Sequence, residues 1–540
     1  MGQMTMDFLA GAFHFDFLHI AVLIAIGMLI WDTIEVGRND AANIVNAVFG
    51  ARVLRRRRAV QIAGLAVIIG AWASSPVMET ARKGIFDPTV LSLHDALAIY
   101  ISVYLTDTVL LYSFSAYGMP ISTTAGLVFS LLGGGFMVGG ANAVQWTSSG
   151  VVLLAIVCSI FISGACGFLI QRAFRGAMGQ DCDDIEKIRL HGPWIAGALL
   201  TGLAFFILMK GMKNVAFIKV IKAGTLDLLG APFFLISLWC LLAILVWVIM
   251  RVGGVIVQRN LFSSLAIMGM IATAFAFGQN DLANCASPGV ASYMIYQHGE
   301  IATSVEVPSW LLLFCGVLLA IGMSTRNAQR VTRAEVNTGS QGDIVRLYAP
   351  RWCLWLAELF VKSHDPSKAL APEPLIQEKK KLQHYDALRA AVITSVSGSV
   401  IAFASGLALP VSTTYVAFAA VIATGWADRI FVRGDSHLKI ARMIWVIFGW
   451  FFSAFLAALI TGFCALTISK MNSIGGAAGA MAVIVLLCVN LTVRYIMKKR
   501  ADVQEERMQL EAAERKKKLL NVTDSKEQPL YASELDSHEM

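Results

Sequence analysis

The sequence predicts an all-α polytopic membrane protein with two repeats, broken or re-entrant helices and about ten to twelve membrane segments. The first observation is composition, since hydrophobic residues make up 57% of the 540 positions and charged residues only 15%. Soluble domains carry roughly 25% charged residues. The second observation is the recurrence of long apolar stretches, and the third is a pair of polar strings that occurs twice in the same order.

The apolar stretches are spread over almost the whole chain. Several approach the roughly 20 residues that a helix needs to cross the hydrocarbon core of a bilayer. They cover residues 17–36, 59–78, 151–171, 193–211, 233–252, 310–323, 390–409 and 443–467. We therefore expect a multi-pass protein of the cell membrane, in contact with the lipid bilayer.

The formal net charge of +8 does not indicate nucleic-acid binding, because the basic residues gather at the ends of apolar stretches. Arg52 and the run from Arg55 to Arg58 are the clearest example. This pattern is typical of cytoplasmic anchoring by Lys and Arg. The nine cysteines are scattered and show no paired ligand spacing, so we expect neither disulfides nor a zinc site.

Two polar strings divide the chain into repeats. The string GRNDAANIVNA begins at Gly37 and returns as GQNDLANCASP at Gly278, and PISTT at Pro120 returns as PVSTT at Pro410. Many secondary transporters are built from inverted halves, and by this analogy of fold we expect two inverted repeats.

The second repeat is the longer one, because a polar stretch lies inside it. We expect residues 1–325 to hold the first repeat and the start of the second, and residues 326–385 to form a polar cytoplasmic loop. The remainder of the second repeat then covers residues 386–497. Residues 498–540 begin with basic residues and alternate in charge, which predicts a cytoplasmic C-terminal tail.

The Asn-Asp strings are candidate cation sites. At helical spacing, Asn39, Asn43 and Asn46 share one face, beside Asp40. A carboxylate inside a membrane segment costs several kcal/mol unless it is paired or binds a cation, and carboxylate and amide oxygens suit a hard cation such as sodium. The two copies together supply six candidate ligands: Asn39, Asp40, Asn43, Asn280, Asp281 and Asn284.

The Ser-Thr strings are candidate oxyanion sites. Each proline is expected in the first turn of a helix, where its missing N–H leaves nothing unpaired. The following N–H groups and hydroxyls would then face an anion at the positive end of that helix. Because both copies precede apolar stretches, we expect two broken or re-entrant helices whose starts meet at a central ligand. The hydroxyls belong to Ser122, Thr123, Thr124, Ser412, Thr413 and Thr414.

These paired strings resemble those of the PiT inorganic phosphate transporter family, whose repeats carry Gly-x-Asn-Asp-x-x-Asn and Pro-x-Ser-Thr-Thr. The stretch SPVMETARKGI, with Glu79, Thr80, Arg82, Lys83 and Gly84, is also similar to a family segment. The resemblance runs from about residue 17 to residue 490 and leaves out the tail.

The resemblance implies an all-helical bundle of two inverted repeats, with a homodimer as one assembly that it allows. It also implies that the six Ser and Thr hydroxyls hold phosphate while the six Asn and Asp side chains coordinate sodium next to it. The chain departs from the family by placing Arg38 and Gln279 where a small residue usually precedes the Asn-Asp pair. A fixed positive charge at Arg38 puts the coupling stoichiometry in doubt.

We therefore expect a symporter of inorganic phosphate with sodium as the coupling ion and no resident cofactor. Protons in place of sodium, a metal-phosphate complex, and sulfate or another tetrahedral oxyanion remain alternatives. A passive cation channel is a further one, because paired acidic residues can line a pore. An enzyme is not expected, since the chain has no Gly-x-Ser-x-Gly, no Gly-x-x-x-x-Gly-Lys and no His/Glu zinc string.

Overall fold

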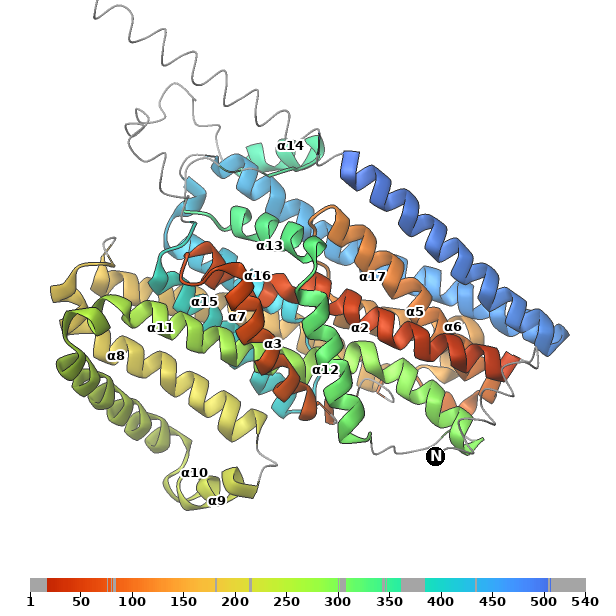
Figure 1. Cartoon of the computed structure of the whole chain (residues 1–540), viewed down its shortest axis with the longest axis horizontal. Coiled ribbons are helices and arrows are strands. Elements are labelled where there is room, and N and C mark those ends of the chain that lie inside the picture. The colour runs from red at the N-terminus through yellow and green to blue at the C-terminus, as the bar shows by residue number, and fades with distance from the viewer. Residues whose placement is uncertain are drawn as a thin grey trace, which may run out of the picture. The chain divides into compact units, whose positions relative to one another are not determined.

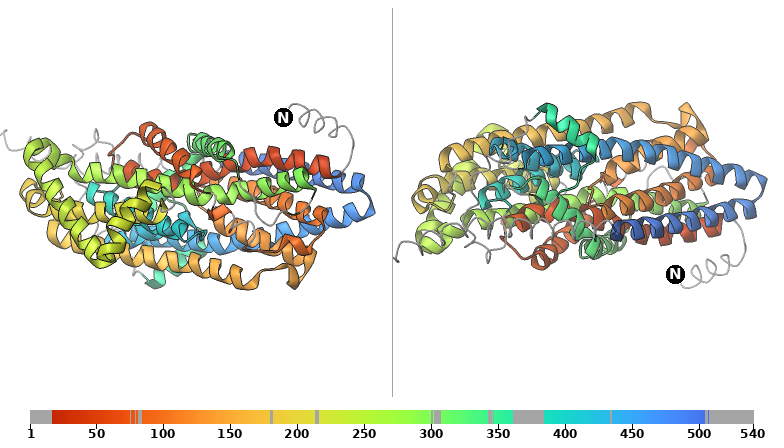
Figure 2. Two further views of the ribbon diagram at one scale, coloured as in Figure 1. Left: turned by 90° about the horizontal axis from the view of Figure 1, so that it is seen from below. Right: turned by 90° about the horizontal axis from the view of Figure 1, so that it is seen from above.

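The computed structural model describes residues 17–506, except 75, 79, 81–83, 180–181, 213–215, 300, 302–306, 342–344, 346, 361–383, 433–434 and 504–505. Within these residues the chain forms helices and no strand, apart from one isolated bridge between Phe86 and Val144. Two compact units divide the chain, Met1–Asn490 and Leu491–Met540. All candidate site residues belong to the first unit, whose long helices run side by side (Figures 1 and 2).

The same series of helices occurs twice in the first unit. The first series consists of α2 (Phe17–Gly50), α3 (Arg56–Trp72), α5 (Leu93–Ala116), α6 (Thr123–Gly139) and α7 (Trp146–Met178). The second consists of α11 (Ala231–His298), α12 (Ser309–Met323), α15 (Ala387–Gly406), α16 (Thr413–Ala427) and α17 (Ser436–Ile474). Each series carries its Asn-Asp string on the first helix and its Ser-Thr string before the fourth. The inversion of one series relative to the other stays a prediction.

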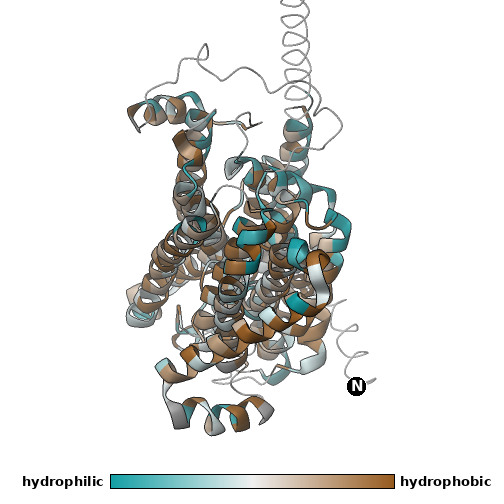
Figure 3. Ribbon diagram, turned by 90° about the vertical axis from the view of Figure 1, so that its left-hand side faces the viewer, coloured by the Kyte–Doolittle hydropathy of each residue, from teal (hydrophilic) through white to brown (hydrophobic). Residues whose placement is uncertain are grey.

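Further helices connect the two series and extend the second. Helix α8 (Ile185–Leu203) continues into a π-helix (Ala204–Gly211), and α9 (Ala216–Gly224) and α10 (Leu226–Leu229) follow. After α17 comes a helix at Gly476–Val503. In Figure 3 the long helices are mainly brown, and the teal of hydrophilic residues gathers toward helix ends. An apolar helix surface of this kind suits lipid contact.

The number of spans meets the lower end of the expected range. Eight helices of the described residues are long and apolar enough to cross a membrane, and a ninth span results if the bent pair α12 and α13 (Arg326–Thr338) counts as one. Helix α11 is broken at Gly254, whose φ of 61° is non-helical. Counting its two parts separately gives ten segments, which confirms a multi-pass membrane protein.

Helices α6 and α16 are apolar but have only 17 and 15 residues, too few for a complete crossing. Ser122 caps α6 by accepting from Ala125 N–H at 2.9 Å, and Ser412 caps α16 by accepting from Tyr415 N–H at 3.1 Å. Each proline of these strings therefore lies before the cap. The expectation that it occupies the first helical turn is wrong, because the serine side chain defines the start.

The stretch expected to be a loop at 326–385 contains two helices in its described part, α13 and α14 (Arg351–Phe360). Ala328, Val331, Thr332, Glu335 and Val336 are buried on one face of α13, and α13 packs on α2. The sequence of α13 is rich in charged and polar residues, so its few apolar residues at helical spacing were not recognised as a buried face. The domain boundaries predicted from the sequence stay predictions, and residues 507–540 of the tail lie outside the described residues.

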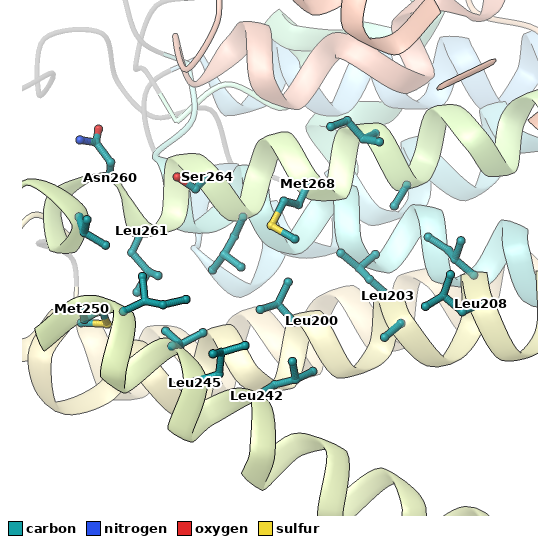
Figure 4. A pocket seen from close by; sticks show the side chains of 18 of the residues that line it. Leu200, Leu203, Leu208, Leu242, Leu245, Met250, Asn260, Leu261, Ser264 and Met268 are labelled. Carbon is teal, nitrogen blue, oxygen red and sulfur yellow. The ribbon is translucent and has the colours of Figure 1, made fainter. Parts of the chain in front are cut away.

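A wide apolar groove of about 800 Å³ lies between α3, α8 and the two parts of α11. Figure 4 shows its lining, in which leucine and methionine side chains such as Leu203, Leu245 and Met268 predominate. Asn260 and Ser264 are its polar members, and no charged residue lines it. Such a surface does not suit an oxyanion, so the transport site has to be sought at the paired strings.

Candidate transport site

The starts of α6 and α16 meet in the interior of the protein, where the two Asn-Asp strings surround them. All twelve candidate residues are buried. Thr124 Oγ1 donates to Val411 O at 2.9 Å, and Thr414 Oγ1 lies 3.2 Å from Ile121 O. Each Ser-Thr string thus contacts the backbone of the other. The four strings, far apart in the sequence, form a single cluster.

The first Asn of each motif binds the backbone before the facing helix start. With its amide oriented to match its neighbours, Asn39 Nδ2 donates to Ile121 O at 3.0 Å, and Asn280 Oδ1 accepts from Val411 N–H at 3.2 Å. Asn280 Nδ2 also donates to Val411 O at 2.6 Å. Both side chains therefore fix the entry into a helix, since their amide groups are engaged with main-chain atoms.

The second Asn of each motif crosses to the opposite Ser-Thr string. Asn43 Nδ2 donates to Thr414 Oγ1 at 3.0 Å, and Asn284 Nδ2 donates to Thr124 Oγ1 at 2.8 Å. The same amides lie 3.1 Å from Asp40 Oδ1 and 2.8 Å from Asp281 Oδ1, respectively. The amide donors are used within the protein, which leaves the amide oxygens to face a ligand.

Asp40 and Asp281 come together at one hydroxyl. Thr123 Oγ1 lies 3.2 Å from Asp40 Oδ2 and 3.1 Å from Asp281 Oδ1. A hydroxyl has one proton, so it can satisfy only one of the two carboxylates fully. Both aspartates are 0% exposed, and within the described residues neither forms an ion pair with a basic side chain.

Four buried oxygens of the cluster form no hydrogen bond of regular geometry within the described residues. They are Asn43 Oδ1, Asn284 Oδ1, Asp281 Oδ2 and Thr413 Oγ1. Unpaired buried oxygens cost free energy unless a ligand compensates them. Three of the four can only accept, which is the donor set that a hard cation prefers. The residues present therefore fit sodium.

The positive charge of Arg38 is paired with Glu35 and not with the aspartates of this cluster. Its Nη1 lies 2.8 Å from both carboxylate oxygens of Glu35, one helical turn earlier, and its guanidinium lies 6.0 Å from the Tyr112 ring centroid. Gln279, at the matching place in the second string, directs Nε2 toward Ala73 O at 3.4 Å. The Glu35 carboxylate neutralises Arg38 locally, a partner that the sequence alone did not identify.

The first glycine of each Asn-Asp string permits a close helix crossing. A Cβ at Gly37 would lie 2.1 Å from Leu319 O of α12, and one at Gly278 would lie 2.2 Å from Val67 O of α3. Small residues allow such approach in membrane bundles. The repeated glycine was the signal for this packing role, which the sequence analysis missed.

Two further features that the sequence analysis singled out contribute no residue to this cluster. Asn46 shares its helix face with Asn43, but its side chain turns to Glu335 of α13. In the stretch SPVMETARKGI, Glu79, Arg82 and Lys83 lie outside the described residues, and Thr80 Oγ1 donates locally to Pro76 O. Neither observation adds a ligand to the site.

Comparisons with known proteins agree with this geometry. The model of the phosphate transporter family matches residues 36–334 and 379–461. The "Putative phosphate permease" of Pyrococcus horikoshii is 28% identical over 436 residues, which cover 79% of this chain and 92% of that protein. A phosphate permease of the same description from Thermococcus kodakarensis is 27% identical, covering 83% of this chain and 96% of its own length.

A solved structure has the same fold. It is described as "The sodium-dependent phosphate transporter" and matches with a TM-score of 0.63 at 19% identity, over 83% of this chain and 99% of that one. The family consists of transporters, so the prediction that this protein is not an enzyme is confirmed. The resemblance seen in the strings is confirmed as well, because the family match includes all four of them. The chain belongs to the phosphate transporter family.

Proposed function

We propose that the protein is a secondary active symporter that carries inorganic phosphate through the cell membrane with sodium as the coupling ion. The observation that carries this proposal is the meeting of two buried carboxylates, without a basic partner among the described residues, at two helix N-termini. The carboxylates attract cations, while the helix starts attract an anion. A site that binds both charges together can couple their movements.

In this proposal phosphate lies at the starts of α6 and α16. The N–H groups of the first helical residues, Thr123, Thr124, Thr413 and Thr414, have no acceptor within their own helix. The hydroxyls of Ser122 and Ser412 accept from the backbone and keep their own proton to donate. The Thr413 hydroxyl forms no hydrogen bond of regular geometry within the described residues and would bind phosphate directly.

Sodium lies beside the phosphate, held by acceptor oxygens of both strings. Asp40, Asp281, Asn43 and Asn284 supply these oxygens, and Asn39 and Asn280 position the helix starts next to them. The description of the similar solved structure as sodium-dependent supports this choice of ion. A homodimer stays a prediction about assembly.

Uptake into proteoliposomes tests the proposal. Radiolabelled phosphate is offered with a sodium gradient, with a pH gradient, and with neither, and sulfate is added as a competitor in each arm. We expect accumulation only with the sodium gradient and little competition by sulfate. Accumulation driven by acid outside would replace sodium by protons, and equal competition by sulfate would make the protein a general oxyanion permease. Equilibration without accumulation would indicate a channel.

A further inference from the structure

A second buried polar pair lies outside the transport cluster, between α2 and α13. Asn46 Nδ2 donates to Glu335 Oε1 at 2.6 Å. Each residue is 1% exposed. Glu335 comes from the polar stretch inserted into the second repeat, so this contact joins the insert to the helix that carries the first Asn-Asp string.

The remaining oxygens of this pair have no partner. Glu335 Oε2 and Asn46 Oδ1 are buried and make no hydrogen bond within the described residues. If Glu335 were a carboxylate, both atoms would be acceptors, and neither could satisfy the other. Leaving a buried charged oxygen without a donor is costly.

Glu335 forms no ion pair within the described residues, and α5, which also packs on α13, contains no Lys or Arg. Other charged or titratable residues on α13 and on the elements around it include Arg330 and Arg333 of α13 itself, Arg38 and Asp40 of α2, Asp107 of α5, Arg52 after α2, Arg56 of α3, Lys439 and Arg442 of α17, and Tyr385 and Arg389 beside α15.

Several of these groups are bound to main-chain oxygens instead. Arg389 donates to Gly339 O and Val421 O, Arg442 to Gly118 O and Tyr348 O, Arg56 to Met323 O, and Tyr385 to Val336 O. These side chains direct their donors to main-chain oxygens and give none to Glu335 Oε2. A proton on Glu335 can supply the missing donor.

A single proton satisfies both open atoms. A protonated Glu335 can donate from Oε2 to Asn46 Oδ1 while Asn46 Nδ2 donates to Oε1, which closes a ring of two hydrogen bonds between a carboxylic acid and an amide. We propose that Glu335 and Asn46 form a proton-binding site that fastens α13 to α2 in this conformation.

The location of the pair suggests what the proton controls. Asn46 follows Asn43 by three residues, or about 4.5 Å along the helix axis, and lies toward the end of α2 that Arg52 and the run from Arg55 to Arg58 follow. By the positive-inside rule this end is cytoplasmic. The proton site thus lies between the transport cluster and the cytoplasm.

Loss of the proton separates the two helices. The carboxylate formed would face the Asn46 oxygen without a donor and would require water, so α13 would leave α2 and open the cytoplasmic side of the cluster. This consequence for transport rests on the proposed function. The existence of the proton site does not.

Infrared difference spectroscopy tests the proton site directly. Purified wild-type protein at neutral pH should show the carbonyl band of a protonated carboxylic acid that Glu335→Gln lacks, and the band should disappear at alkaline pH. Glu335→Gln is a conservative variant, because an amide can form the same two hydrogen bonds with Asn46. Glu35→Gln is the matched control and should leave the band unchanged, since Glu35 is paired with Arg38.

Three results would overturn the proton site. They are no difference between wild type and Glu335→Gln at neutral pH, a band that persists at all pH values, and a band that sodium removes at constant pH, which would make the ligand a metal cation. Should Glu335→Gln fail to reach the membrane, Asn46→Ala serves instead. It should retain the band but shift it, because both hydrogen bonds between the acid and the Asn46 amide are lost.

Phosphate uptake measured across pH tests the effect on transport. Above its pKa the protonated fraction of Glu335 falls about tenfold per pH unit, so wild-type rates should change with pH relative to those of Glu335→Gln. The ratio of the two proteins cancels the titration of phosphate itself. A constant ratio would overturn the role in transport. Absence of uptake by the wild type at every pH would instead contradict the proposed function, while the infrared band still decides the proton site.

Discussion

At the scale of residues, the two central aspartates have unequal surroundings. Asp40 contacts Asn43 and Thr414 at one oxygen and Thr123 at the other. Asp281 contacts Thr123 and Asn284 at Oδ1 and also interacts with the Thr413 hydroxyl, while Oδ2 forms no hydrogen bond of regular geometry within the described residues. Two carboxylates together balance the charge of two monovalent cations.

Asp40→Asn and Asp281→Asn should each abolish sodium-dependent phosphate uptake while leaving the protein in the membrane. Each change removes one of the two negative charges that the described side chains of this site offer to a cation. Uptake and surface expression are measured together, with Asp87→Asn as the control, because the Asp87 side chain forms only exposed hydrogen bonds, with Thr89 and Gln145. Near-normal uptake by either variant would contradict the cation role.

Thr413→Ala should raise the apparent KM for phosphate roughly ten- to hundredfold, the effect of losing about 1.5–3 kcal/mol from a hydrogen bond to a charged ligand. The Thr413 hydroxyl interacts with the Asp281 carboxyl but forms no hydrogen bond of regular geometry within the described residues. Thr413→Ser keeps the hydroxyl and serves as the control. An unchanged KM in the alanine variant would place the anion elsewhere.

The sequence could supply the residue types of the site but not their partners. A repeated Asp in an apolar stretch needs compensation wherever it lies, so Asp40 and Asp281 were predictable. Which donor each amide would find depends on contacts between strings that are far apart in the chain, such as Asn43 with Thr414. For the same reason, the sequence could not show that Asn46 binds Glu335 instead of joining the cluster, since this depends on the packing of α13 on α2.

At the scale of elements, glycine sets how closely the motif helices approach their neighbours. The carbonyl group of Leu319 lies where a side chain at Gly37 would begin. The crossing of α11 with α3 is built in the same way at Gly278. The two series of helices thus use one packing device, although their remaining side chains differ.

Gly37→Ala and Gly278→Ala should lower stability by about 1–3 kcal/mol or more, because the added methyl groups overpack a backbone contact. Thermal unfolding of the detergent-solubilised protein measures this. Gly27→Ala is a matched control on α2, since a Cβ at Gly27 would have nothing within 4 Å. Equal midpoints for Gly37→Ala and Gly27→Ala would rule out the close crossing.

A buried ionic network joins three other elements. Arg175 of α7 binds Asp428 at the end of α16 and Asp386 at the start of α15. Burial alone would raise the pKa of the Asp386 carboxyl, but Arg175, together with hydrogen bonds from Gln341 and Arg389 N–H, lowers it below its usual value. The network holds the C-terminal end of α16 against its neighbours.

Asp386→Asn should destabilise the protein at neutral pH, and the difference from wild type should disappear in acid. A carboxyl whose folded pKa is depressed stabilises the fold above its unfolded pKa of about 3.9, and this stabilisation is lost as pH falls through the folded value. Unfolding midpoints across pH measure the effect. Asp227→Asn, which breaks an exposed pair with Lys222, should change little; a pH-independent loss in Asp386→Asn would contradict the ionic role.

Helices that are marked by an apolar run, such as α6 and α16, could be predicted from the sequence. The amphipathic helix α13 could not, because its composition is mainly charged and polar. The Ser-Thr strings indicated where α6 and α16 begin, although the position of the proline was misjudged and the capping role of Ser122 and Ser412 was not predicted. The stretch from Arg326 to Thr338 is polar on average. Its buried face is recognised only from the structure, where it packs against α2. Tertiary packing stabilises such a helix more than its own residues do.

At the scale of the whole molecule, the membrane potential decides what the site has to bind. Moving a phosphate dianion into a cell with a negative interior costs about 2.3 kcal/mol per charge per 100 mV. Two sodium ions cancel this electrical cost, and a third lets the potential drive accumulation. Arg38 does not replace one of them, because Glu35 neutralises it within the same helix.

The most direct test of the central claim, that the two aspartates bind the coupling cations, is the current that phosphate evokes across a proteoliposome membrane under a sodium gradient. We expect an inward positive current that increases with sodium and is absent in Asp40→Asn and Asp281→Asn, which is the result that entry of a phosphate dianion with more than two sodium ions would give. Phosphate uptake that continues without sodium, or a current that persists in both aspartate variants, would contradict the account.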